Sequence, residues 1–144
     1  MNIDLQTHVI IVVLGDLVVV DQFIDKTYKR TNSFFTDYGA VHVEMAEPSC
    51  TRLREKIANI GKGIDGAHKV HSTGTYVCIE GPSFSTRAES LMHKQWGGDL
   101  VGMTAMPEAR LAREAQMCYS LIGELLKNCT TIFFIYFLQW ISYI

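Results

Sequence analysis

Apolar and amphipathic segments alternate through the second half of the chain, and this alternation limits the possible folds more than any other feature. The segment 71–80 alternates and ends in an apolar run, which predicts a strand, and the short segments 99–103 and 117–122 are also expected to be strands. Between them, the segments 86–96 and 108–116 carry apolar residues at helical spacing. Strands that alternate with helices in this way are usually parallel neighbours joined by crossover helices. The sequence therefore predicts an α/β fold with a largely parallel sheet covered by helices.

Capping and turn residues mark the ends of the expected helices. Thr86 followed by Glu89 has the T-x-x-E order of a capping box, which predicts that a helix begins there. Pro48 and Gly61 enclose a segment with apolar residues at helical spacing, so we expect another helix over 46–60.

The first part of the chain contains β-branched runs at 9–14 and 17–20, separated by Gly15 and Asp16. Such short apolar runs favour buried strands, and the interruption argues against a membrane helix. The following stretch, 21–37, is polar and is expected to be loop or edge structure.

Charge and cysteine content exclude several classes of protein. The 144 residues include 13 Lys and Arg against 15 Asp and Glu, a formal net charge of −2. Binding nucleic acid by phosphate neutralisation needs a cationic surplus, so we expect no nucleic-acid partner. Four cysteines without a C-x-x-C pair indicate neither a zinc knuckle nor a disulfide framework, and favour a reducing, intracellular setting. His68 and His71 are expected to be solvated, and no metal site is expected.

The last residues, 128–144, carry no charge and are rich in aromatic and β-branched side chains. This composition favours a strand, and the stretch is shorter than the roughly 20 residues that a spanning helix needs. An added buried strand or a non-native extension is therefore favoured over a membrane tail anchor.

Two loops at strand ends carry side chains suited to ligand binding. In an open parallel sheet, ligands bind at the carboxyl ends of strands, where helix N-termini present free N–H groups. In the first loop, Phe84 offers an aromatic face and Ser85 a hydroxyl, and in the second loop Thr104 is placed to hold an anion. Phe84 could equally be a core residue, and Ser85 and Thr104 could equally cap the helices that follow. Together the loops predict a nucleoside and phosphate site.

Six motifs occur in order between residues 15 and 120. They are DQFID at 21–25, AEP at 46–48, TGTYVCIEGP at 73–82, FSTRAE at 84–89, GMT at 102–104 and AREA at 112–115. In this combination they resemble the trimeric purine nucleoside phosphorylase family, and within it the S-methyl-5′-thioadenosine phosphorylases. The resemblance implies a partial three-layer α/β/α domain with a mostly parallel mixed sheet over 15–120. We expect a strand-like extension at 1–14 before it and an aromatic tail outside the family pattern at 121–144.

The resemblance also implies roles for five residues. Phe84 would pack against the purine and ribose, and Met103 would contact the ribose. Thr104 would bind the phosphate nucleophile. Ser85 stands where relatives selective for 6-oxopurines carry Glu, which implies a 6-aminopurine substrate. His42 matches a position near the nucleoside 5′ group, although the alternating residues around it favour a structural role.

The family reaction is phosphorolysis, a pentosyl transfer in purine and methionine salvage. Inorganic phosphate attacks C1′ of methylthioadenosine, and the products are adenine and 5-methylthioribose 1-phosphate. Phosphate is a co-substrate and no metal or organic cofactor is implied, since positioning and electrostatic stabilisation supply the rate. The resemblance further implies a cytoplasmic homotrimer, with the nucleus left open as a second compartment.

Two parts of the family's site fall outside the resemblance. A glycine-rich phosphate loop and an arginine-containing phosphate site come upstream of 21–25 in the family, and an Asp-containing segment that contacts the leaving purine comes downstream of 118–120. We therefore expect a chain shortened at both ends, and the catalytic residues are left unassigned. The alternative to an active phosphorylase is an inactive family member that binds nucleoside or partner subunits.

Overall fold

The computed structural model describes residues 15–63, 69–129 and 132–142. The helices are α1 (Thr51–Gly61), α2 (Arg87–Gln95) and α3 (Ala105–Glu114). The strands are β1 (Leu17–Val20), β2 (Gln22–Lys26), β3 (Val70–His71), β4 (Thr75–Ile79), β5 (Leu100–Gly102), β6 (Cys118–Cys129) and β7 (Ile132–Ser142). The extension expected at 1–14 lies outside the described residues.

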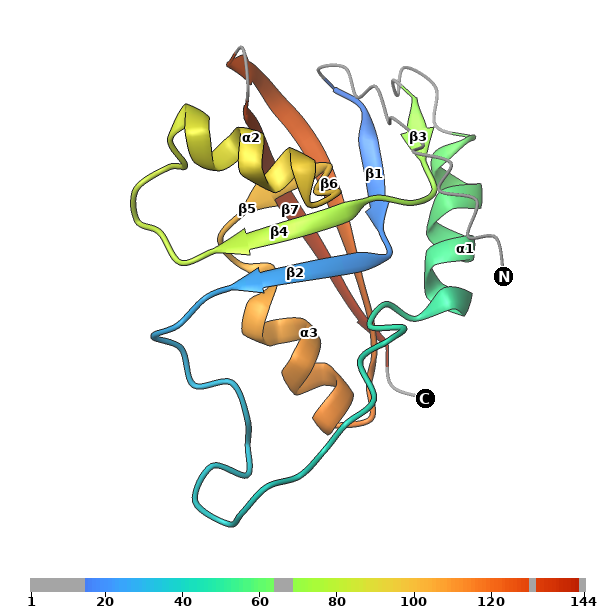
Figure 1. Ribbon diagram of the computed structural model, residues 1–144. Coiled ribbons are helices and arrows are strands. Elements are labelled where there is room, and N and C mark those ends of the chain that lie inside the picture. The colour runs from blue at the N-terminus through green and yellow to red at the C-terminus, as the bar shows by residue number, and fades with distance from the viewer. Residues whose placement is uncertain (1–14, 64–68, 130–131, 143–144) are drawn as a thin grey trace, which may run out of the picture.

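The strands form two sheets (Figure 1). The sheet with strand order β2-β4-β5 is parallel throughout. The sheet with strand order β3-β1-β6-β7 is mixed, because β1 is parallel to β3 while β6 is antiparallel to both β1 and β7. The predicted α/β class with parallel strands is confirmed, and the division into two sheets adds a detail that the sequence pattern does not indicate.

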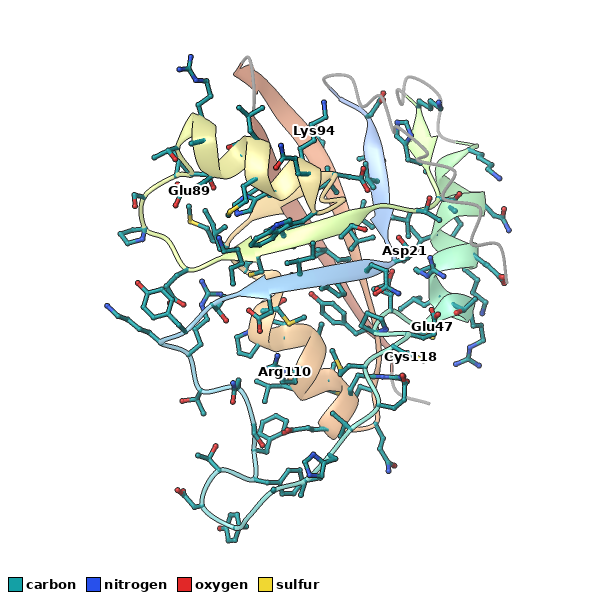
Figure 2. All side chains as sticks on the ribbon, in the orientation of Figure 1. Asp21, Glu47, Glu89, Lys94, Arg110 and Cys118 are labelled. Carbon is teal, nitrogen blue, oxygen red and sulfur yellow. The ribbon has the colours of Figure 1, made fainter. Side chains whose placement is uncertain are left out.

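A shared bend divides the strands between the two sheets. β1 and β2 are separated only by Asp21, and β3 and β4 only by residues 72–74. The Asp21 amide donates to the Gly74 carbonyl at 3.2 Å, and the Gly74 amide donates to the Asp21 carboxylate at 2.7 Å. Figure 2 shows Asp21 at this corner. Because both parallel pairs turn here, the segment 71–80 forms two strands where the sequence predicts one.

Helices cover both faces of the β2-β4-β5 sheet (Figure 1). Successive residues of a strand point to opposite faces. Tyr76 and Cys78 belong to the main core with α3, where the Met106 amide donates to Cys78 Sγ at 3.3 Å. Val77 points toward α2, since a side chain added at Gly98, just after that helix, would begin 2.5 Å from Val77 Cγ2. The layers α2, sheet and α3 give the expected partial three-layer arrangement.

Two predicted segments have different bounds in the structure. The helix expected over 46–60 begins only at Thr51, because Cys50 has extended backbone and its amide donates to the Tyr119 carbonyl at 2.8 Å. The polar stretch 21–37 includes β2, which is an edge strand, in agreement with the expectation of loop or edge structure.

The C-terminal aromatic stretch forms a strand where the structure describes it. β7 pairs with β6 in antiparallel register, with Tyr119 opposite Ile141 and Ile122 opposite Leu138. The expectation of a strand is therefore confirmed for 132–142. Within the described ranges, no helix is both long enough and apolar enough to cross a membrane.

His71 is not solvated as the sequence suggested. Its side chain is 9% exposed, and its Nε2 lies 2.8 Å from the Asp16 carboxylate. The parallel pairing of β1 with β3 brings the two residues together, although 55 positions separate them in the chain. The sequence pattern could not reveal this pairing. His68 lies outside the described residues.

Candidate functional site

The loops that follow β4 and β5 leave the sheet at the same edge. Cys78 of β4 lies opposite Gly102 of β5 in parallel register, so both strands end side by side. Gly81 has a φ of +73°, and a side chain there would begin 2.7 Å from Met103 Sδ. Glycine is needed at this position both for its backbone conformation and for the close approach of Met103. The structure thus brings Met103 against the loop that carries Phe84 and Ser85.

A pocket of about 220 Å³ lies between the end of β2, the loop 80–85 and α2. Phe84 lines this pocket and is 65% exposed, so it is not the core residue that the sequence left open as an alternative. Ser85 and His93 also line it and are buried, with exposures of 8% and 2%. Neither Ser85 Oγ nor His93 Nδ1 has a hydrogen-bond partner among the described residues. Two buried polar atoms in one pocket suit a polar ligand.

Burial and the neighbouring Lys26 favour the neutral form of His93. Lys26 Nζ lies 3.3 Å from His93 Nε2 and 5.1 Å from the centre of the Trp96 ring. Burial and the nearby ammonium of Lys26 lower the pKa of His93, and Glu89 opposes them only in part. A neutral imidazole that accepts from Lys26 at Nε2 carries its proton on Nδ1, so His93 presents a donor.

Arg30 joins the loops at this edge. Its guanidinium donates to the carbonyls of Ile79 and Glu80 at 3.3 and 2.9 Å and to the carbonyl of Met106. It also pairs with the Glu80 carboxylate at 3.4 Å. Sequence reasoning placed Arg30 in the polar stretch 21–37, expected to be loop or edge structure, and missed this role, because nothing in its spacing distinguishes it from Lys29.

Thr104 lies at the start of α3 and is exposed. Its side chain makes no capping hydrogen bond, so the alternative of a simple helix cap is not realised. Its amide approaches the Tyr76 hydroxyl at 3.5 Å. Met106 has non-helical backbone, with φ −113° and ψ 134°, so the regular turns of α3 begin after it and Thr104 does not lie at their first amides. The exposed hydroxyl of Thr104 is able to donate a hydrogen bond to an anion.

His42 lies apart from these residues. It is exposed and lines a different pocket, of about 400 Å³, together with Arg110 and Glu114 of α3. The structure therefore brings together Phe84, Ser85 and Met103 at one sheet edge, but it does not bring His42 to them within one chain. Over the residues the structure describes, no cluster of three or more His, Cys, Asp or Glu side chains could hold a metal ion.

Comparison with known proteins identifies the fold. The family model described as the phosphorylase superfamily matches residues 11–122. The chain belongs to the phosphorylase superfamily. The matched range contains both loops that follow β4 and β5, from Phe84 to Thr104.

Individual phosphorylases show the same similarity. The chain is 50% identical over 109 residues to S-methyl-5′-thioadenosine phosphorylase of Cereibacter sphaeroides and 48% identical over 114 residues to that of Danio rerio. Each match covers 76% of this chain, but 37% and 40% of the respective relative. The chain thus spans about two fifths of the length of these curated relatives.

A solved phosphorylase has the same fold. The structure of methylthioadenosine phosphorylase from Schistosoma mansoni in complex with tubercidin matches with a TM-score of 0.70 and 41% sequence identity. The match covers 78% of this chain and 46% of the other. The complex of that protein with adenine matches with a TM-score of 0.68 and 41% identity, over 75% of this chain and 44% of the other.

Proposed function

We propose that the edge formed by the loops after β4 and β5 binds methylthioadenosine and phosphate, and that the chain acts as an S-methyl-5′-thioadenosine phosphorylase. The observation that carries this proposal is the convergence of Phe84, Ser85 and Met103 at one carboxyl edge of a parallel sheet. Two phosphorylases of that name are 50% and 48% identical to the chain over 109 and 114 residues, and both loops lie within the matched family range. The reaction class is pentosyl transfer.

Each proposed role follows from the chemistry of the side chain. The exposed ring of Phe84 would stack on the purine, and the buried hydroxyl of Ser85 would hydrogen-bond its edge. Met103, which packs on Gly81, would contact the ribose. The exposed hydroxyl of Thr104 would donate a hydrogen bond to the phosphate.

The proposed step is a displacement at C1′. A phosphate oxygen forms a bond to C1′ while the bond between C1′ and the purine nitrogen breaks, and the electron pair of that bond leaves with adenine. Thr104 would hold the phosphate dianion in line with C1′, and the pocket would hold the base in place. No metal or organic cofactor is part of the proposal.

Nucleoside binding without turnover is the second candidate, and the pocket chemistry favours it in one respect. Both carboxylates that line the pocket are held ionised, because hydrogen bonds from the Tyr28 amide lower the pKa of Glu80 and hydrogen bonds from Thr86 lower the pKa of Glu89. With His93 neutral as well, the described lining of this pocket offers no carboxylic acid and no imidazolium to protonate a departing purine at neutral pH.

Adenine release from methylthioadenosine separates the two candidates. The purified chain is incubated with substrate, with and without phosphate, and inosine serves as the control nucleoside. Phosphate-dependent adenine release that falls at least tenfold in Thr104→Ala supports the phosphorylase. Adenine binding by folded chain without any release would support the binding protein and contradict the phosphorylase.

We also propose that the chain assembles as a cytoplasmic homotrimer that acts in purine and methionine salvage. The loop between β2 and α1 supports an assembly, because it exposes Tyr28, Phe34 and Tyr38 by 74%, 58% and 88%. Contact of His42 with the 5′ group would then come from a second copy. Sedimentation velocity tests the assembly, which a strictly monomeric chain at micromolar concentration would contradict.

A further inference from the structure

Two cysteines meet between the start of α1 and the start of β6. Cys50 is the residue before α1, and Cys118 is the first residue of β6. Their Sγ atoms are 2.8 Å apart, although 68 positions separate them in the chain. The Cys50 amide donates to the Tyr119 carbonyl at 2.8 Å and fixes the two backbones beside each other. Figure 2 shows Cys118 next to the segment that carries Glu47.

The surroundings favour a thiolate at Cys50. Burial alone would raise the pKa of this thiol, but the hydrogen bond with Cys118, the first amides of α1 and the guanidinium of Arg52 together hold it below its ordinary value. The hydrogen bond to Cys50 raises the pKa of Cys118 in turn. A thiolate at a helix N-terminus beside an arginine is the form that reacts with disulfides.

Reagents can reach this pair from solution. Cys50 and Cys118 are partly exposed, and both line a surface pocket of about 610 Å³. Cys78 offers a contrast within the same chain, because it is fully buried and its sulfur accepts a hydrogen bond from Met106. Burial also raises the pKa of the Cys78 thiol.

We propose that Cys50 and Cys118 form a redox-active pair that small-molecule disulfides oxidise to an intramolecular disulfide. The sulfurs need to approach by only about 0.8 Å to reach the bonded distance of about 2.05 Å. The proposal rests on the geometry of the pair and on the groups around it, and it does not depend on the proposed function.

The oxidation proceeds by two exchanges. The Cys50 thiolate attacks one sulfur of the small disulfide, whose other sulfur leaves as a thiolate. Cys118 loses its proton and attacks Cys50 Sγ, and the second small thiolate leaves. The two protein thiols are thereby oxidised, and the reagent is reduced to two thiols, which take up the two protons. The new bond closes a loop from α1 to β6, and such closure stabilises a fold.

Peptide mapping of the unmodified chain tests the proposal directly. The folded chain is treated with oxidised glutathione, alkylated, digested and analysed by mass spectrometry. We expect the Cys50 and Cys118 peptides to be joined, Cys78 to be alkylated only after unfolding, and the midpoint of thermal unfolding to rise on oxidation. A chain that stays folded with both thiols free, or in which Cys50 pairs with Cys78 or Cys129, would overturn the proposal.

Two serine variants separate the roles of the thiols. In Cys118→Ser, the first exchange still occurs but no second thiol resolves it, so Cys50 should accumulate as a mixed disulfide with glutathione. In Cys50→Ser, Cys118 should react with oxidised glutathione at least tenfold more slowly than Cys50 does in Cys118→Ser. Equal reactivity of the two thiols in these variants would contradict Cys50 as the attacking group, and Cys129→Ser serves as the control that should oxidise like the unmodified chain.

Discussion

Ser85 and His93 carry buried polar atoms that no described residue satisfies. A buried polar atom without a partner costs about 1–3 kcal/mol, so a protein that keeps two in one pocket gives up stability there. Buried polar atoms without a protein partner are often found where a ligand binds. Ser85 and His93 therefore allow stability and binding to be tested separately.

We expect Ser85→Ala to leave the free energy of unfolding unchanged or to raise it by up to about 1 kcal/mol, because the substitution removes an unsatisfied hydroxyl. The same change should weaken adenine binding about three- to tenfold, since the proposed hydrogen bond is lost. Urea unfolding and calorimetric titration measure the two effects. The exposed Ser83 lines the same pocket, so Ser83→Ala is the matched control for the unfolding measurement only. A loss of more than about 1 kcal/mol in Ser85→Ala alone would show that the Ser85 hydroxyl is a structural group.

His93 predicts a pH dependence of stability. Its pKa in the folded chain lies below the unfolded value of about 6.5, so the unfolded state binds more protons as the pH falls through that value. The contribution of His93 is therefore complete above about pH 6.5 and decreases toward lower pH. Denaturant unfolding at about pH 7.5 and about pH 5.5 should show a smaller loss of stability in His93→Gln than in the unmodified chain. An equal or larger loss in the variant would contradict this assignment.

Sequence reasoning located some site residues and missed others for a physical reason. Phe84, Ser85 and Met103 follow strands that are visible as apolar runs, and the parallel sheet then places their loops at one edge. Arg30 and His93 join this edge from a long loop and from the second turn of α2, where side-chain spacing carries no signal of a distant partner.

At the level of elements, α2 shows how much local sequence can specify. Thr86 Oγ1 accepts from the Glu89 amide at 3.2 Å, and the Thr86 amide donates to the Glu89 carboxylate at 2.7 Å, which confirms the predicted capping box. The bend at Asp21 and Gly74 could not be predicted from local sequence, because it depends on hydrogen bonds between residues 53 positions apart. Local patterns therefore predict helix ends better than sheet boundaries.

Loss of the cap should destabilise the chain. Thr86→Ala removes the side-chain acceptor for the Glu89 amide, and we expect it to lower the free energy of unfolding by about 1 kcal/mol. Thr51→Ala, at the exposed first residue of α1, is the matched control and should change it by less than about 0.5 kcal/mol. Chemical unfolding of both variants checks the difference, and equal effects would argue against the cap.

The end of β5 requires a glycine. A side chain at Gly102 would begin 2.0 Å from the Tyr76 hydroxyl, and Tyr76 is fully buried and has no room to retreat. Gly102→Ala should therefore lower the free energy of unfolding by about 3 kcal/mol or more. At Gly63 the nearest atom would lie 3.6 Å away, so Gly63→Ala should be nearly neutral. If Gly102→Ala unfolds at the same denaturant concentration as Gly63→Ala, the packing of Tyr76 under β5 is wrong.

At the level of the whole molecule, the chain has the fold of the phosphorylase superfamily, with a candidate site at one edge of its parallel sheet. The family model matches residues 11–122, whereas the motifs alone placed the domain at 15–120. The alternation of strands and helices predicts the α/β class, because the spacing of apolar residues within each element shows whether it is a strand or a helix. The division into two sheets depends on contacts between distant segments, so no local pattern reports it.

The most direct measurement is an amide NMR titration of the folded chain with adenine. The proposed site predicts that the amide signals of Gly81, Phe84 and Ser85 shift together and saturate, while those of His42 and of α1 stay in place. Shifts confined to the pocket around His42 and Arg110, or no shift at millimolar adenine, would contradict a purine site at the ends of β4 and β5.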